Sequence, residues 1–205
     1  MNWIKRYFCG SSPSIAPEMK YLIAGLGNIG DEYENTRHNI GFKVLDALAK
    51  ENDLKFSSDR LAAVAELRFK GRTLVLIKPS TYMNLSGKAV NYWMQAHKIS
   101  KENVLVITDD IALPFGTLRM KGKGSDGGHN GLKNIQETLN SVEYARLRFG
   151  VGSEFNKGKQ VDYVLGKWSD EEEQKLQERI KVATDMIKGF ATIGLQLTMT
   201  NFNNK

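Results

Sequence analysis

Cysteine and histidine are scarce in this sequence, and their scarcity limits the chemistry that the chain can perform. Cys9 is the only cysteine among 205 residues, so no intramolecular disulfide can form and a reducing compartment is favoured. Only three histidines are present, and His97 falls in the last turn of a predicted helix, where cations are favoured in any case. Since a metal site needs three or more clustered ligands, we expect no metal. The Gly-x-Ser-x-Gly elbow of many nucleophilic hydrolases is also absent.

Long apolar runs are missing as well. No stretch approaches the roughly 20 apolar residues that span a bilayer, so we expect a cytoplasmic protein without a membrane partner. Residues 1–19 contain no apolar segment long enough for a signal peptide, and their glycine, serine and proline content suggests a flexible N-terminal arm. The remaining length and a hydrophobic content of 41% suit one folded domain over residues 20–195, followed by a C-terminal tail over 196–205.

Positive charge is plentiful and unevenly distributed. The net charge of +6 favours a polyanionic partner. Residues 116–160 contain eight lysines and arginines against four acidic residues, which leaves +4 in that segment. A solvated basic face would explain this charge equally well. The glycine-rich loop Gly122 to Asn130, which lies inside the segment, favours a binding surface.

Apolar periodicity predicts strands and helices in alternation. Ser169 and Glu172 have the spacing of a capping box at the start of the last helix. Alternation of this kind is typical of α/β proteins, and we expect a single-domain three-layer sandwich with a twisted, mostly parallel (mixed) sheet flanked by helices. The expected strands are 21–24, 61–69, 73–77, 104–107, 116–121 and 145–151, and the expected helices are 40–51, 86–97, 132–139 and 169–194.

The segment Gly25 to Gly30 has the pattern G-x-G-x-x-G directly after the first predicted strand. This pattern binds dinucleotides only when a helix follows at once and presents its N-terminal amides to a pyrophosphate. The next ten residues have no helical period and several are acidic, so a dinucleotide site is disfavoured. The polar loop instead presents His38.

Four polar loops follow predicted strands and meet at one edge of such a sheet. They carry His38, His129, the pair Asp109-Asp110 and several asparagines. A histidine base, an aspartate that orients it and amides that hold a carbonyl group suit direct attack by an activated water. A loop histidine is more often a plain surface residue, and an aspartate pair can simply cap a turn. These residues alone leave both a hydrolase and a polyanion-binding protein open.

The motifs in these loops closely resemble those of bacterial peptidyl-tRNA hydrolases, from about Lys20 to Gly194. The resemblance is carried by Gly25-Leu26-Gly27-Asn28, Thr36-Arg37-His38-Asn39-Ile40-Gly41, Lys78-Pro79-Ser80-Thr81-Tyr82-Met83-Asn84-Leu85-Ser86-Gly87, Asp109-Asp110, Gly127-Gly128-His129-Asn130-Gly131-Leu132 and Arg146-Leu147-Arg148-Phe149-Gly150-Val151-Gly152.

The resemblance implies an enzyme that cleaves the ester between a peptide and the 3′-terminal ribose of tRNA, without metal or cofactor and as a monomer. It implies that His38 is the general base, that Asp109 orients His38, and that Asn130 positions the water or stabilises the oxyanion. The other implied roles are peptide binding by Asn28, Asn84 and His129, a cleft lining formed by Tyr33 and Met83, and contacts from Lys121 and Arg148 to the tRNA 5′-phosphate.

The chain departs from the family pattern at three positions. Ile29 replaces a common proline, and Thr108 and Ala112 replace a frequent histidine and a frequent acid beside Asp109-Asp110. The main alternative is a non-catalytic RNA-binding relative with the same fold, which the retained His38 and Asp109 argue against. A nucleotide-dependent oxidoreductase is the alternative from another class.

Overall fold

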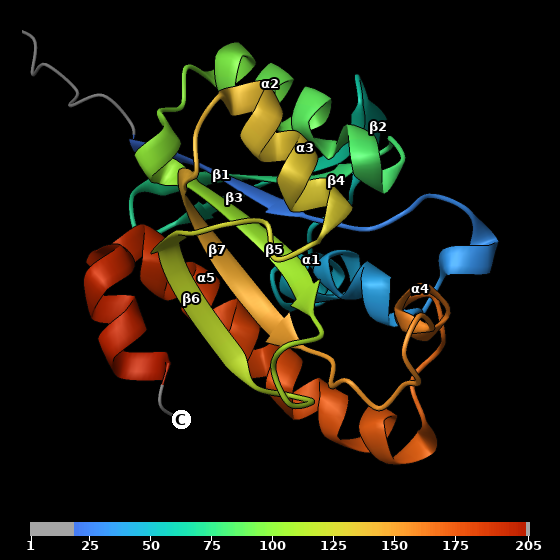
Figure 1. Ribbon diagram of the computed structural model, residues 1–205. Coiled ribbons are helices and arrows are strands. Elements are labelled where there is room, and N and C mark those ends of the chain that lie inside the picture. Colours follow the sequence, from blue (N-terminus) through green and yellow to red (C-terminus); the bar gives the residue numbers. More distant parts are fainter. Residues whose placement is uncertain (1–18, 204–205) are drawn as a thin grey trace, which may run out of the picture.

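A computed structural model describes residues 19–203, so the predicted arm up to residue 18 lies outside the described residues. Seven strands form one sheet in the order β2-β3-β4-β1-β5-β7-β6 (Figure 1). The central strands pair in parallel, and the outer strands add antiparallel pairs, so the sheet is mixed as predicted. The central strands are β4 (Arg72–Pro79), β1 (Met19–Gly25), β5 (Val104–Asp110) and β7 (Glu143–Gly150). The outer strands are β3 (Ala62–Phe69) and the two edge strands β2 (Ser57–Asp59) and β6 (Leu118–Lys123).

Helices cover both faces of the sheet (Figure 1). Successive strand residues point to opposite faces, and in β1 Ile23 belongs to one buried cluster while Leu22 belongs to the other. α1 (Ile40–Glu51) and α5 (Asp170–Phe202) pack into the first cluster, and α2 (Ser86–His97) and α3 (Asn130–Leu139) pack into the second. The predicted three-layer α/β sandwich is confirmed. Within residues 19–203, no helix combines the length and the apolar character needed to cross a membrane.

Shorter elements shape the loops at the carboxyl ends of the central strands. Because β5 extends to Asp110 instead of ending at Ile107, Asp109 lies within the strand and is buried. The strand β2 was not predicted, since its three residues are polar and exposed. The short helical elements are η1 (Asp31–Tyr33), η2 (Arg37–Asn39), η3 (Met83–Leu85), η4 (Lys101–Asn103) and α4 (Gln160–Val164).

The last helix continues beyond its predicted end near Gly194. Gly194 has φ 82° and ψ 169°, which interrupts the helix, and helical structure then resumes as far as Phe202. The second part packs on the first, because a Cβ on Gly189 would lie only 3.1 Å from Oγ1 of Thr198. Residues 196–202 of the predicted tail are therefore helical. The prediction placed the break correctly and missed the helix beyond it.

The start of α1 lies directly against the end of β1. A Cβ on Gly25 would lie 2.3 Å from the carbonyl oxygen of Gly41, and a Cβ on Gly41 would lie 2.3 Å from the amide nitrogen of Leu26. Any larger residue at either position would collide with backbone atoms, which cannot move aside cheaply. The first glycine of the G-x-G pattern thus permits close packing between strand and helix. Only the three-residue turn η1 follows Gly30 directly, and the first α-helix, α1, begins at Ile40.

Candidate active site

A cleft of about 680 Å³ opens at the carboxyl ends of the central strands. Ligands bind in this position in open α/β sheets. The cleft is lined by all but one of the ten predicted site residues: Asn28, His38, Met83, Asn84, Asp109, Lys121, His129, Asn130 and Arg148. The four polar loops therefore meet as expected.

Asp109 is the centre of the polar network in the cleft. Its Oδ1 lies 2.9 Å from Nδ1 of His38 and 3.0 Å from Nε2 of His129, and the residue is only 4% exposed. Burial alone would raise the pKa of the carboxyl group, but its interactions with His38 and His129 outweigh burial and hold the pKa far below its usual range. Asp109 is therefore ionised at neutral pH and accepts from both rings.

His38 is held in the tautomer that a general base requires. An ionised carboxylate can only accept hydrogen bonds, so the Nδ1 that faces Asp109 carries the proton and Nε2 keeps its lone pair. Burial lowers the pKa of His38, while the charge and the hydrogen bond of Asp109 raise it by more, so the net shift is upward. His38 is thus a stronger base than an ordinary histidine.

His129 has no ring nitrogen left for a ligand. It is the N-cap residue of α3, and its Nδ1 accepts hydrogen bonds from the backbone amides of Gly131 at 3.1 Å and Leu132 at 3.3 Å. The proton must therefore lie on Nε2, which donates to Asp109. The resemblance implied that His129 holds the peptide backbone. The structure differs, because both ring nitrogens already have partners within the protein.

His38, Asp109 and His129 also bring three potential metal-ligating atoms within 4.8 Å of one another. A ring nitrogen that carries a proton offers no lone pair to a metal. To bind a cation, His129 would have to move its proton to Nδ1 and leave the Gly131 and Leu132 amides unpaired. The donor arrangement therefore favours a hydrogen-bonded carboxylate over a metal centre.

Asn28 joins two of the loops and keeps one group for a ligand. Its Oδ1 accepts a hydrogen bond from the backbone amide of Met83 at 3.0 Å. The side chain of buried Asn39 binds the backbone of Asn28: its Oδ1 accepts from the Asn28 amide at 2.8 Å, and its Nδ2 donates to the Asn28 carbonyl oxygen at 2.9 Å. No other residue of the described range 19–203 binds Nδ2 of Asn28, which is therefore a donor in the cleft. The clamping role of Asn39 was not predicted, because it depends on contacts 11 residues apart.

Asn84 and Asn130 are exposed in the cleft, and within residues 19–203 their side-chain amides bond to no other residue. Both are available to a bound molecule. Met83 is buried beneath them, and its Sδ would lie only 2.7 Å from a Cβ on Gly131, so this glycine allows the packing of the thioether.

Tyr33 is not among the residues that line this cleft, so its predicted contact with a bound peptide stays a prediction. It ends the turn η1, and its carbonyl oxygen accepts hydrogen bonds from the amide and the hydroxyl of Thr36. These turns carry the loop between Asn28 and His38 away from the strand ends, and the blue segment projects from the body of the molecule in Figure 1. Sequence periodicity gave no sign of them.

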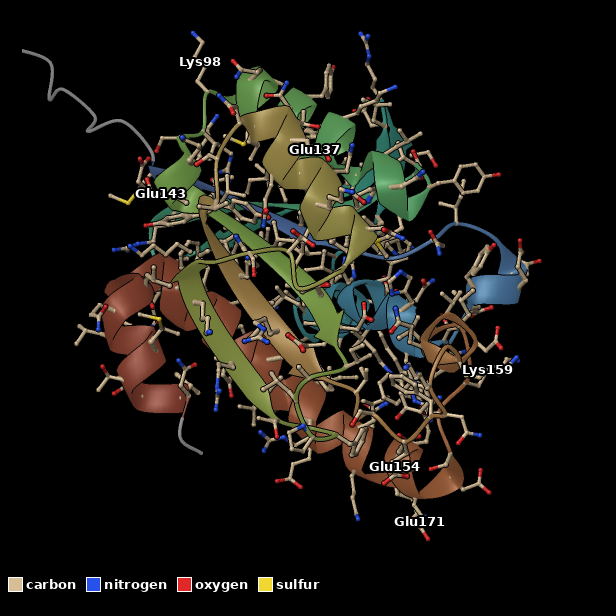
Figure 2. All side chains as sticks on the ribbon, in the orientation of Figure 1. Lys98, Glu137, Glu143, Glu154, Lys159 and Glu171 are labelled. Carbon is tan, nitrogen blue, oxygen red and sulfur yellow. The ribbon has the colours of Figure 1, made fainter. Side chains whose placement is uncertain are left out.

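Basic side chains gather along the cleft, beside the two histidines. Lys121, Lys123, Arg146 and Arg148 line it, whereas Asp126 is the one acidic residue of segment 116–160 that does. The other acids of that segment, Glu137, Glu143 and Glu154, are exposed and do not line the cleft (labelled in Figure 2). The positive charge of the segment is therefore concentrated on the cleft side.

Two of these basic residues have partners within the protein. Nε of Arg148 donates to Oδ2 of Asp110 in an ion pair, which places the guanidinium next to the strand end that carries Asp109. Buried Arg146 donates to the carbonyl oxygens of Ser125 at 2.7 Å and Gly124 at 2.6 Å. Arg146 thus supports the glycine-rich loop, a role that its charge alone did not reveal.

The comparisons with known proteins agree with this geometry. The model of the peptidyl-tRNA hydrolase family matches residues 22–205. Peptidyl-tRNA hydrolases of Cytophaga hutchinsonii and Phocaeicola vulgatus are 63% and 61% identical over 187 residues, which are 91% of this chain and 100% of each relative. The crystal structure of peptidyl-tRNA hydrolase from Acinetobacter baumannii matches with a TM-score of 0.84 at 32% identity, over 89% of this chain and 94% of that chain. This chain belongs to the peptidyl-tRNA hydrolase family.

Proposed function

We propose that this protein hydrolyses the ester between a peptide, or an N-blocked amino acid, and the 3′-terminal ribose of tRNA, and so recycles tRNA released from aborted translation. The observation that carries the proposal is the His38–Asp109 pair in the cleft, which leaves Nε2 of His38 as a free base. Family membership supplies the substrate. A non-catalytic RNA-binding relative would have no need of this tautomer.

In the proposed reaction, Nε2 of His38 takes a proton from water as the water oxygen attacks the ester carbonyl carbon. The ionised Asp109 stabilises the imidazolium that forms. The amide nitrogens of Asn28 and Asn130 are donors for the oxyanion of the tetrahedral intermediate. Collapse of the intermediate breaks the bond to the ribose oxygen, which takes the proton back from His38. The products are tRNA with its terminal hydroxyl and a peptide carboxylic acid, which loses its proton to solvent at neutral pH.

The basic side of the cleft supports the nucleic-acid half of the proposal. Lys121 is exposed, and Arg148 is held by Asp110 beside the strand that carries Asp109. A phosphate bound by these two residues would fix the tRNA end relative to the base. Phosphate contacts position a nucleic acid without reading its sequence.

Turnover of N-blocked aminoacyl-tRNA tests the proposal. We expect the wild type to release the amino acid, and His38→Ala to lose about 10²–10⁴-fold in kcat, as expected for removal of a general base. His97→Ala is the matched control, since His97 lies at the end of α2 and stacks on Trp93. A near-normal rate in His38→Ala would disprove the base assignment, and tRNA binding without turnover by the wild type would favour the RNA-binding alternative.

The protein is further proposed to act as a monomer in the cytoplasm. The location follows from the proposed substrate, which is produced during translation. Equilibrium sedimentation with and without tRNA checks the oligomeric state, and a dimer in either sample would contradict it.

A further inference from the structure

Arg37 directly precedes the proposed base, yet its side chain binds a distant part of the chain. The residue is largely buried, and its guanidinium donates to the carbonyl oxygen of Lys167 and to Oε2 of Glu172, both at 2.7 Å. Its Cζ also lies 4.4 Å from the centroid of the Tyr163 ring and 5.5 Å from that of Trp168. Such a planar, many-donor contact is specific to arginine.

The backbone of the same turn is attached to the same segment. The amide of Arg37 donates to the carbonyl oxygen of Gly166 at 3.1 Å, and Thr36 forms an isolated bridge with Lys167. Backbone and side chain therefore hold the turn before His38 at several points. On the other side of His38, Asn39 binds the backbone of Asn28.

Glu172 is a rigid anchor for this contact. Its Oε2 also accepts from the amide of Ser169 at 2.7 Å, and the hydroxyl of Ser169 accepts from the amide of Glu172 at 3.2 Å. This capping box fixes the Glu172 side chain at the start of α5. The helix is in turn held in the core by fully buried Leu176.

We propose that Arg37 is a positioning residue for the hydrolysis: it holds the His38 turn against segment 163–172 so that the imidazole stays aligned with Asp109. α4, which overlaps the start of this segment, contributes Val161 and Val164 to the cleft wall. Arg37 thereby also sets the distance between the base and that wall. The proposal rests on the ester hydrolysis proposed above. A displacement of about 1 Å at a reacting group can cost on the order of 10²-fold in rate.

Arg37→Met tests the proposal, because methionine keeps an apolar stem and removes every donor. If the circular dichroism spectrum shows that the variant is folded, we expect its kcat for N-blocked aminoacyl-tRNA to be about 10- to 100-fold lower than that of the wild type. We also expect the acid limb of the kcat profile to move to lower pH, because a misaligned His38 loses the contact with Asp109 that raises its pKa. A purely structural role would lower Tm and leave both readouts unchanged.

Asp185→Asn is the matched control. Asp185 pairs with Lys181 of the same helix at 2.8 Å, and neither residue contacts the His38 turn. We expect its kcat and acid limb to equal those of the wild type. Glu172→Gln keeps an acceptor for the Ser169 amide but lacks the charge that binds Arg37, and it should share the defect of Arg37→Met in milder form.

If folded Arg37→Met has the same kcat as the wild type and an acid limb at the same pH, the proposal is overturned. If that variant does not fold, Arg37→Lys and Glu172→Gln decide in the same way: shifted profiles support positioning, and wild-type profiles refute it. The wild-type turnover and the His38→Ala loss are measured in parallel, so a failure of the hydrolase assignment would be recognised separately.

Discussion

Nε2 of His129 donates a hydrogen bond to Oδ1 of Asp109 across 3.0 Å. The proton in this bond is fixed from the other side of the ring, where Nδ1 accepts from two backbone amides of α3. Because both ring nitrogens are bound in this way, His129 holds the carboxylate of Asp109 in place.

His129→Asn separates this role from peptide binding. Asparagine is a good N-cap residue, so α3 should remain capped, but its shorter side chain does not reach Asp109. We expect kcat to fall about tenfold, as for loss of one charge-assisted hydrogen bond, while KM stays near the wild-type value. His129→Ala should additionally cost about 1 kcal/mol in the free energy of unfolding. A raised KM with unchanged kcat in His129→Asn would instead assign the residue to peptide binding.

The pH dependence of hydrolysis reports on the His38–Asp109 pair. Since only neutral His38 can accept a proton, the rate should fall as the pH drops through a pKa above the ordinary 6.5. In Asp109→Asn the carboxylate that raises the pKa of His38 is lost, whereas burial of His38, which lowers this pKa, remains. The acid limb should therefore move to lower pH, with a large loss of kcat because the tautomer is no longer held. Asp46→Asn, which alters an exposed partner of Lys78, is the control. An acid limb that stays in place in Asp109→Asn would show that another group titrates.

The same pKa shifts set the sign of the effect on stability. The raised pKa of His38 stabilises the fold below the unfolded-state pKa, and this contribution is lost as the pH rises through the folded-state value. The lowered pKa of Asp109 stabilises the fold above the unfolded-state pKa of its carboxyl group, and this contribution is lost as the pH falls towards the folded-state value.

The sequence predicted those parts of the molecule that local periodicity determines. The bounds of α1 and α2 match the predicted 40–51 and 86–97, because both helices have a regular apolar face. The meeting of the polar loops was also predictable, since parallel strands bring their carboxyl ends to one edge.

The individual roles within the cleft were not predictable in the same way. They depend on which atoms face each other across long sequence separations. Arg37 and Glu172 lie 135 residues apart in the sequence, and the hydrogen-bonded residues Asn28 and Met83 lie 55 residues apart. The position of Tyr33 outside the cleft lining depends on two short turns without apolar periodicity. The free Nε2 of His38 and the two bonded ring nitrogens of His129 follow only from distances.

Salt dependence tests the proposed phosphate contacts. Each lysine or arginine that contacts phosphate should contribute about 0.7–0.9 to the magnitude of the slope of log K against log salt. We therefore expect Lys121→Ala and Arg148→Ala each to weaken tRNA binding and to flatten the slope by this amount. Lys133→Ala is the control, because Lys133 belongs to the same basic segment but does not line the cleft. Unchanged slopes in Lys121→Ala and Arg148→Ala would show that these two residues do not contact phosphate.

The end of α5 protects the edge strand that carries Lys121. Oδ1 of Asn203 accepts from the amide of Met120 at 2.7 Å, and its Nδ2 donates to the carbonyl oxygen of Met120 at 2.9 Å. This side chain thus pairs with β6 as another strand would, where an unpaired edge is a liability. Asn203→Ala would leave two buried polar groups of Met120 unpaired, which costs about 1–3 kcal/mol for each group that stays dry. We expect faster hydrogen exchange at the Met120 amide and weaker tRNA binding, with kcat at saturating substrate unchanged. Asn203→Asp keeps the acceptor for the Met120 amide and should protect that amide better than alanine does. Equal protection of the amide in all three proteins would show that the helix holds β6 without Asn203.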